Sequence, residues 1–396
     1  MDEKDDYDLV HINTIGLKSF QVLRQAKKRG IPVIYHTHTT YEDFKGSVKF
    51  SNQIAPIIKF WTKILYNSAD YLISPSEYTK NLIKTKYLRK DKEIRVISNG
   101  VDTKNFCKNE ELKNKFLEEY KIDKPLVITA GLPFERKGIQ DFMKLAEKRK
   151  DYQFMWFGSS SIKSMLPKKI QHIIENPPKN VIFPGYVEKD MLIGAFSAAK
   201  AFLFMTYEEN EGIVVLEALS AQLPLIVRDI PVYNKWLQDG VNCFKAKNNT
   251  GFIEKLRKVV NGEVENLDEI VKNAYELAKE RDLTEIGKKY KEYYEKDITL
   301  SISKILQDML KSAGAKVIMT RTTDKDVYAP FADGVTELQT RCDIANKAKS
   351  DVFICVHIDS FVNETVDGTT TYYYPKSDQD LLLAHMIHQS TIDNLS

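Results

Sequence analysis

The sequence predicts an α/β protein with parallel sheets, and its length and composition indicate several ordered domains. Short apolar runs alternate with amphipathic stretches over residues 8–293, which is the βαβ rhythm of parallel sheets covered by helices. The chain has 396 residues, of which 43% are hydrophobic and 29% are charged. That length suggests two or three domains, and that composition excludes global disorder.

Composition and the first residues exclude several other classes of protein. The sequence holds no run of about 18 apolar residues, so it predicts no transmembrane helix. Its start is acidic and lacks the apolar stretch of a secretory signal. The four cysteines are scattered, as in a reduced cytosolic protein, and a net charge of +3 is too small to indicate nucleic-acid binding. We therefore expect a cytoplasmic protein.

The first region, residues 1–120, shows the βαβ rhythm twice. The expected strands are residues 8–13, 31–38, 71–74 and 94–98, and the expected helices are residues 17–29 and a second one that begins at Ser76. A highly charged helix over residues 108–121 is interpreted as the connection to the next domain.

Two further regions follow. In residues 121–293 the expected strands are 126–130, 154–157, 181–183, 201–204 and 225–227, with a closing helix over 283–295. In residues 294–396 the expected helices are 298–313, 338–349 and 381–395, and the expected strands are 317–320 and 352–356. This last region is interpreted as a partial α/β domain.

The most informative motif is a pair of carboxylates, Glu209 and Glu217, that follows an expected strand with Gly212 between them. Carboxylates accept hydrogen bonds from vicinal hydroxyls, so such a pair can hold a sugar and a ribose. Gly212 allows a ligand close to the backbone, and the next helix N-terminus can face phosphates. On spacing alone, a helix-start Glu and a surface Glu are the plainer interpretation of the pattern.

A second motif places Arg136 and Lys137 between Gly131 and Gly138, just before a helix. Cations beside a helix N-terminus suit a diphosphate, although a solvated basic loop is the plainer interpretation. A third motif, Asn99-Gly100 after a strand, predicts only a turn when it is taken alone.

Taken together and in this order, the motifs resemble the retaining GT-B glycosyltransferases that carry an E-x7-E motif. The strings that carry the resemblance are Pro75–Tyr78, Ile97–Phe106, Gly131–Gly138, Asn180–Val187, Glu209–Glu217 and Pro231–Phe244. Three strings, HTHTTYEDF from His36, GLPFERKG from Gly131 and EENEGIVVLEAL from Glu208, look most like Firmicutes 1,2-diacylglycerol 3-glucosyltransferases. The resemblance implies two Rossmann-like domains, residues 1–120 on the acceptor side and residues 121–293 for the nucleotide sugar.

The resemblance also implies a role for each motif. Glu209 would contact the donor sugar with help from backbone amides near Glu211 and Gly212, and Glu217 would accept the ribose hydroxyls. Arg136 and Lys137 would neutralise the departing diphosphate, so that no metal is required. The uracil ring would lie near Gly185 and Tyr186, and His38 would lie near the sugar and the acceptor.

Three qualifications accompany these expectations. Relatives often carry Arg where this chain has Leu132, so Arg136 is expected to supply that charge. His38 is one of three histidines, with His11 and His36, that a strand-end hydrogen bond would also explain. The family normally has a strand, a Gly-rich loop and a helix before the segment seen here, so the first domain is expected to be incomplete, with an exposed sheet edge.

Residues 47–67 and 80–92 are the two stretches that bear on the acceptor side. The first stretch is rich in isoleucine and aromatic residues, and the second holds six basic residues against Asp91 alone. Such a combination suits an anionic membrane surface. The lipid acceptor itself is what the family resemblance implies. A helix that fills the core beside a solvated basic face is the alternative.

The third region, residues 294–396, resembles the zinc-dependent N-acetylmuramoyl-L-alanine amidases. The resemblance places two zinc ligands at Glu295 and His357, while the first ligand and the catalytic Glu have no counterpart here. Because catalytic zinc usually needs three protein ligands, this is expected to be an incomplete zinc site. His385 and His388 are interpreted as a solvent-facing pair.

Three functional hypotheses follow. The leading one is a hexosyltransferase that moves a sugar, with glucose as the best guess, from a UDP-sugar to a lipid such as diacylglycerol at the inner face of the membrane. The second is a zinc amidase of peptidoglycan. The third is an inactive chimera that only binds nucleotide or glycan, since no linker separates the two parts near Tyr294–Lys296.

Overall fold

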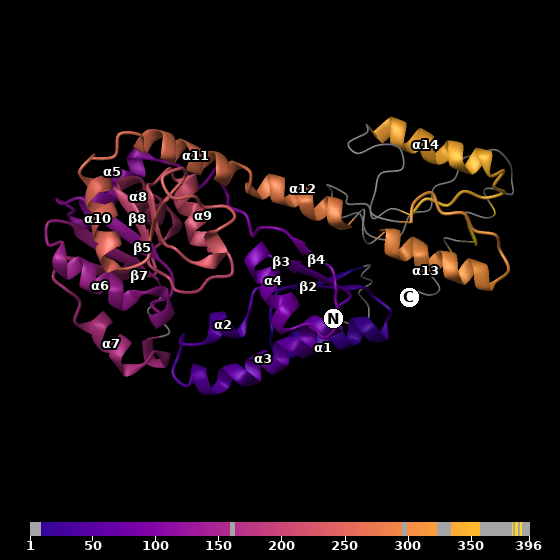
Figure 1. Ribbon diagram of the computed structural model, residues 1–396, viewed down its shortest axis with the longest axis horizontal. Helices are drawn as coiled ribbons and strands as arrows, with labels where there is room; N and C mark the ends of the chain where they lie inside the picture. The colour runs from indigo at the N-terminus through magenta and orange to yellow at the C-terminus, as the bar shows by residue number, and fades with distance from the viewer. Residues whose placement is uncertain are drawn as a thin grey trace. The chain divides into compact units, whose positions relative to one another are not determined.

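The computed structural model describes residues 9–158, 163–294, 299–322 and 334–356, together with Leu382, His385, Met386 and Gln389. The chain divides into two compact units, and the boundary falls between Ile286 and Gly287. The first unit contains two parallel sheets, as the sequence predicts (Figure 1).

The first sheet has four parallel strands in the order β1-β2-β3-β4. Its strands are β1 (Val10–Ile12), β2 (Val33–His36), β3 (Tyr71–Ser74) and β4 (Ile94–Val96), and its helices are α1 (Leu17–Lys28), α2 (Tyr41–Phe44), α3 (Ser51–Ser68) and α4 (Glu77–Lys86). Every residue of β2 is buried, which explains its continuous apolar pattern. Helix α4 starts where expected because the Ser76 side chain accepts a hydrogen bond from the Thr79 amide.

The second sheet has six parallel strands in the order β10-β9-β8-β5-β6-β7. The strands are β5 (Leu126–Ala130), β6 (Gln153–Phe157), β7 (Val181–Gly185), β8 (Ala201–Phe204), β9 (Leu225–Arg228) and β10 (Phe244–Ala246). All are predicted except β10, which has three residues with Lys245 in the middle and so lacks an apolar run. The strand order reverses between β5 and β8, and ligands of such sheets bind at that reversal.

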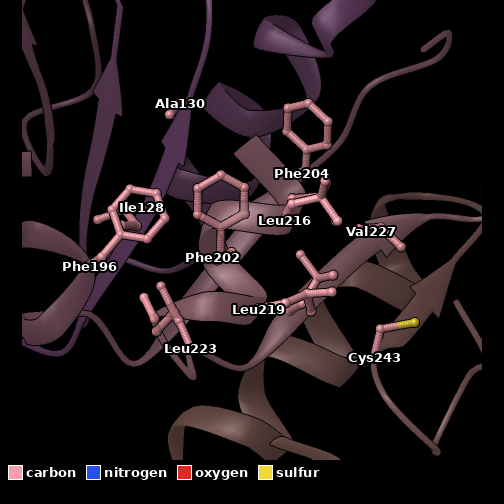
Figure 2. Packing of buried hydrophobic residues seen from close by; sticks show 14 of the residues in the cluster. Ile128, Ala130, Phe196, Phe202, Phe204, Leu216, Leu219, Leu223, Val227 and Cys243 are labelled. Carbon is pink, nitrogen blue, oxygen red and sulfur yellow. The ribbon is translucent and has the colours of Figure 1, made fainter. Parts of the chain in front are cut away.

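Helices cover both faces of this sheet (Figure 1). One face carries α5 (Glu110–Tyr120), α8 (Lys189–Ala198), α9 (Ile213–Ser220) and α11 (Leu267–Lys279), and the other carries α6 (Ile139–Lys148), α7 (Lys168–Glu175) and α10 (Asn249–Val260). Figure 2 shows the first of these cores, where Phe196 lies beside Ile128 of β5 and Phe202 lies near Leu216 of α9. The charged helix α5, expected as a connection, packs on α8 through the fully buried Phe116.

Helix α12 (Leu283–Tyr293) follows, and the second unit contains α13 (Thr299–Ser312) and α14 (Gly334–Lys347), both close to their predicted bounds. The strands predicted at residues 317–320 and 352–356 are wrong, because neither segment is a strand in the structure. Val352, Phe353 and Ile354 remain about half exposed. An apolar run becomes a strand only with a neighbouring strand to pair with, and the described part of this unit offers none. The helix expected over residues 381–395 lies almost wholly outside the described residues.

Among the described residues, no helix is both long enough and apolar enough to cross a membrane. This agrees with the absence of a long apolar run in the sequence.

Candidate functional site

The site lies where the loops that follow β5 and β8 meet. Gly138 joins the first loop to α6 with a φ of 80°, and a side chain there would collide with the Met205 carbonyl oxygen, 2.3 Å from the Cβ position. Two backbones can approach this closely only at glycine. The sheet reversal and this contact together bring the Arg136–Lys137 turn against the loop that carries Glu209.

Glu209 is at the centre of the site and only 6% exposed. Its Oε1 accepts hydrogen bonds from the Lys137 ammonium and from the Thr206 hydroxyl at 3.0 Å, and an Arg136 nitrogen lies 3.9 Å away. The structure therefore brings together the first carboxylate of the E-x7-E motif and both cations of the basic turn. Such a buried carboxylate requires paired donors.

Arg136 is held on three sides by the protein. Its Nε donates to the Ser47 hydroxyl at 3.1 Å, one terminal nitrogen donates to the Glu208 carbonyl at 3.1 Å, and the other lies 2.8 Å from the Asp43 carboxylate. Asp43 and Ser47 belong to the first sheet's segment, so this arginine links the two α/β regions. Sequence reasoning missed Asp43, although the residue lies inside a string that carries the family resemblance.

The residues on either side of Glu209 also contact the first region. The Glu211 carboxylate accepts hydrogen bonds from the Asn99 backbone and side-chain amides, both at 2.8 Å. Burial raises the pKa of Glu211, and its hydrogen bonds to Ser98 and Asn99 oppose that rise. The Glu211 side chain is thus committed to the Asn99 turn, while the prediction for this residue concerned its backbone amide.

Asn210 adds two more links across the same boundary. Its side-chain amide donates to the His38 carbonyl oxygen at 2.6 Å, and its own carbonyl oxygen accepts from the Ser76 and Thr79 hydroxyls at 2.6 and 3.0 Å. These contacts place the backbone of His38 beside the Glu209 loop.

The three histidines form a stack. The His38 ring lies 3.7 Å from the His36 ring, which lies 5.9 Å from the His11 ring. Burial lowers the pKa of His36 to about 2 and that of His11 to about 4, with a smaller contribution from His38 in each case, and burial also lowers the pKa of His38. All three are therefore neutral at physiological pH.

Gly212 begins α9 with a φ of 95°, a conformation that favours glycine. The hydroxyl of the buried Tyr233 lies 3.2 Å from the position a Cβ would take at Gly212. The backbone amides at the start of α9 form the helix N-terminus that the sequence predicts beside the phosphates.

Glu217 lies in α9, where every other residue except Ser220 is apolar. Burial raises the pKa of its carboxyl to about 7. Among the described residues no side chain or backbone group forms a hydrogen bond or an ion pair with this carboxylate, in contrast to Glu209. The structure therefore shows no direct contact between Glu217 and the Arg136–Lys137 turn.

Gly185 ends β7 with a φ of 79°, and its carbonyl oxygen accepts a hydrogen bond from the Gly158 amide at 3.3 Å. The next residue, Tyr186, is 75% exposed. Its ring is open to stacking with a flat ligand.

Helix α3 presents a row of exposed apolar side chains. Ile54, Ile57 and Phe60 are 41%, 66% and 63% exposed, and Phe50, just before the helix, is 71% exposed. Trp61 instead packs inward against Phe20, with its Nε1 donating to the Ile15 carbonyl oxygen at 2.7 Å. Both interpretations of residues 47–67 therefore hold for part of the helix. One face packs into the core, and the other, called the bare face below, exposes its apolar side chains to solvent.

The basic stretch over residues 80–92 is more neutralised than its sequence indicates. Lys86 pairs with Glu42 at 2.8 Å, Lys84 with Asp91 at 3.0 Å and Lys80 with Glu77 at 3.6 Å. Acids distant in sequence or one helical turn away therefore cancel part of the predicted positive surface.

The two predicted zinc ligands, Glu295 and His357, lie outside the described residues, as does His388. Within the described part of the chain, no group of three His, Cys, Asp or Glu side chains is placed to hold a metal ion.

Family models match the chain in three consecutive segments. Residues 2–105 match Glycosyltransferase Family 4, residues 110–277 match Glycosyl transferases group 1, and residues 280–396 match N-acetylmuramoyl-L-alanine amidase.

Solved structures support the predicted GT-B fold. Sucrose-phosphate synthase from Thermosynechococcus elongatus has a TM-score of 0.60 at 16% identity, covering 77% of this chain and 74% of that one. HepE of Anabaena, solved with UDP and glucose, has a TM-score of 0.59 at 17% identity, covering 72% and 77%.

Curated relatives are more specific. The processive diacylglycerol alpha-glucosyltransferase of Acholeplasma laidlawii is 37% identical over 301 residues, which is 76% of this chain and 88% of the relative. The alpha-galactosylglucosyldiacylglycerol synthase of Streptococcus pneumoniae is 29% identical, covering 58% and 63%. A germination-specific N-acetylmuramoyl-L-alanine amidase of Bacillus subtilis is 28% identical over 106 residues, 26% of this chain and 45% of the relative.

These matches confirm the resemblance on which the site was predicted. The chain belongs to the diacylglycerol glucosyltransferase family of GT-B glycosyltransferases, and an amidase-like segment follows its glycosyltransferase domains.

Proposed function

We propose that this chain is a retaining hexosyltransferase that moves glucose from UDP-glucose to diacylglycerol or a related glycolipid. The observation that carries the proposal is the cluster of Glu209, Lys137 and Arg136 at the sheet reversal, beside the N-terminus of α9. The A. laidlawii relative bears the name of an alpha-glucosyltransferase. Because the glucose of UDP-glucose is itself α-linked, an α-linked product means retention of configuration.

In this proposal the protein acts mainly through electrostatics. The leaving UDP gains negative charge as its bond to the sugar breaks, and Lys137, Arg136 and the backbone amides of α9 would stabilise that charge. No protein nucleophile is assigned, and attack is taken to occur on the face from which UDP leaves. The transferase needs no metal if these cations do the neutralising.

Glu209 would hold the sugar hydroxyls, and Glu217 would hold the ribose hydroxyls. The partial burial of Glu217 without a partner supports this role, because such a carboxylate gains most from a ligand that donates hydrogen bonds. The exposed ring of Tyr186 would stack on the uracil, and the neutral His38 would face the sugar and the acceptor.

Turnover by the purified full-length chain tests the proposal. Radiolabelled UDP-glucose and vesicles containing diacylglycerol should yield a glucolipid, and Glu209→Ala should abolish it. Glu254→Ala is the matched control, since that carboxylate forms an exposed pair with Lys258 on α10. Absence of glucolipid with wild-type protein that binds UDP would reject the acceptor, and absence of UDP binding would reject the whole proposal.

The bare face of α3 supports an anionic membrane as the surface on which the acceptor is met. Ile54, Ile57 and Phe60 form an exposed apolar row on α3, and such rows are typical of interfacial helices. Ile57→Asp should lower co-sedimentation with phosphatidylglycerol vesicles several-fold and leave UDP binding unchanged. Equal sedimentation of both proteins would reject this surface.

A second candidate function is amidase activity on peptidoglycan, which the match over residues 280–396 favours. The purified chain would then bind close to one zinc ion and release soluble peptides from cell walls. A preparation that holds no zinc after incubation with the metal and leaves cell walls intact would reject it.

A further inference from the structure

The arginine predicted to meet the diphosphate already has three partners within the protein. Arg136 uses Nε for Ser47, one terminal nitrogen for the Glu208 carbonyl, and the other for the Asp43 carboxylate at 2.8 Å. Its side chain is 12% exposed. A diphosphate can therefore engage this guanidinium only by taking it from a partner that it already has.

Asp43 is the partner that a diphosphate replaces most naturally. It is the only one of the three that carries a negative charge, and phosphate oxygens match the guanidinium in the same two-pronged way as a carboxylate. Its side chain is 22% exposed, so solvent and small groups reach it. It lies on the short helix α2 of the first, acceptor-side region, whose start is capped by the Thr40 side chain.

Once Arg136 turns to the donor, the Asp43 carboxylate loses its main compensation. Burial raises the pKa of Asp43, the nearby Glu209 adds to this rise, and Arg136 and Lys137 oppose it. A half-buried carboxylate without a cation needs a hydrogen-bond donor. The hydroxyl of an acceptor is such a donor, and α2 lies only a few residues before the bare face of α3.

We propose that Asp43 is a substrate-binding residue that holds Arg136 until the nucleotide sugar binds and then accepts a hydrogen bond from the acceptor hydroxyl. Donor binding thereby creates the acceptor's hydrogen-bonding partner, so the donor binds first and the acceptor second. This inference rests on the proposed function, because it takes the UDP-sugar as the donor.

The test is Asp43→Asn, which keeps the shape of the side chain and removes its charge. With Arg136 released, UDP should bind roughly fivefold more tightly in calorimetry, equivalent to about 1 kcal/mol. In the same variant glucolipid formation should fall at least about tenfold, with a raised KM for the acceptor. Tighter product binding together with weaker transfer is a combination that general damage to the fold does not produce.

Two further variants complete the experiment. Glu42→Gln changes the neighbouring carboxylate of the same helix, which pairs with Lys86 and Tyr87 inside the first region, and should leave the UDP affinity within about twofold. Asp43→Glu restores the charge and should return the UDP affinity towards the wild-type value. Unchanged or weaker UDP binding by Asp43→Asn overturns the inference alone, whereas a wild-type protein that binds no UDP overturns the proposed function and the inference with it.

Discussion

The surroundings of Glu209 and of Glu217 differ: the first carboxylate has cationic partners in the protein, and the second has none among the described residues. Lys137 and Arg136 from the loop after β5, together with the Thr206 hydroxyl, compensate the charge of Glu209 within the protein. Helix α9 provides Glu217 with no partner among the described residues, and burial raises the pKa of that carboxyl to about 7.

A binding-site carboxylate can therefore be compensated by the protein or left for the ligand to compensate. A compensated carboxylate stabilises the empty protein and must exchange partners when substrate binds. An uncompensated one destabilises the empty protein and gains from the ligand directly. Substitutions at the two positions should therefore change stability in opposite directions.

The larger effect is expected at Glu209. Glu209→Gln leaves the Lys137 ammonium, whose side chain is 15% exposed, without its counter-ion. Removing one partner of a buried ion pair is costly, so the free energy of unfolding should fall by about 2 to 3 kcal/mol. Urea denaturation measures this, and saturating UDP should recover more stability in the variant than in the wild type. Wild-type stability in the variant would show that the pair contributes nothing.

At Glu217, a substitution is expected to raise the free energy of unfolding. Its carboxyl has a folded pKa of about 7, above the usual value, so its contribution to stability is fully present at low pH and is lost as the pH rises through 7. Glu217→Gln should consequently gain on the order of 1 to 2 kcal/mol at pH 8 and nothing at pH 4. Urea denaturation at both pH values checks this, and a variant less stable than wild type at pH 8 would contradict it.

Much of this arrangement is predictable from the sequence, for a physical reason. Buried parallel strands appear as apolar runs, and loops at the same sheet edge meet, so the approach of Glu209 to Lys137 follows from strand positions. Strand positions do not predict the contacts of Asp43 with Arg136 and of Asn99 with Glu211. These contacts join segments about a hundred residues apart through the packing of two regions. The strands expected at 317–320 and 352–356 failed for a related reason, since pairing partners are not encoded in a single run.

The pH dependence of donor binding is the finest test of the comparison. If Glu217 accepts hydrogen bonds from ribose hydroxyls, it binds best when ionised, and it ionises as the pH rises through about 7. UDP-glucose is the right probe because both of its phosphates are esterified and keep their charge over this range. Its affinity should rise several-fold between pH 6 and pH 8 in the wild type and stay flat in Glu217→Gln. Glu209→Gln, which leaves Glu217 unchanged, should keep the wild-type slope. A slope that survives in Glu217→Gln would assign the titration to another group and remove the ribose role from Glu217.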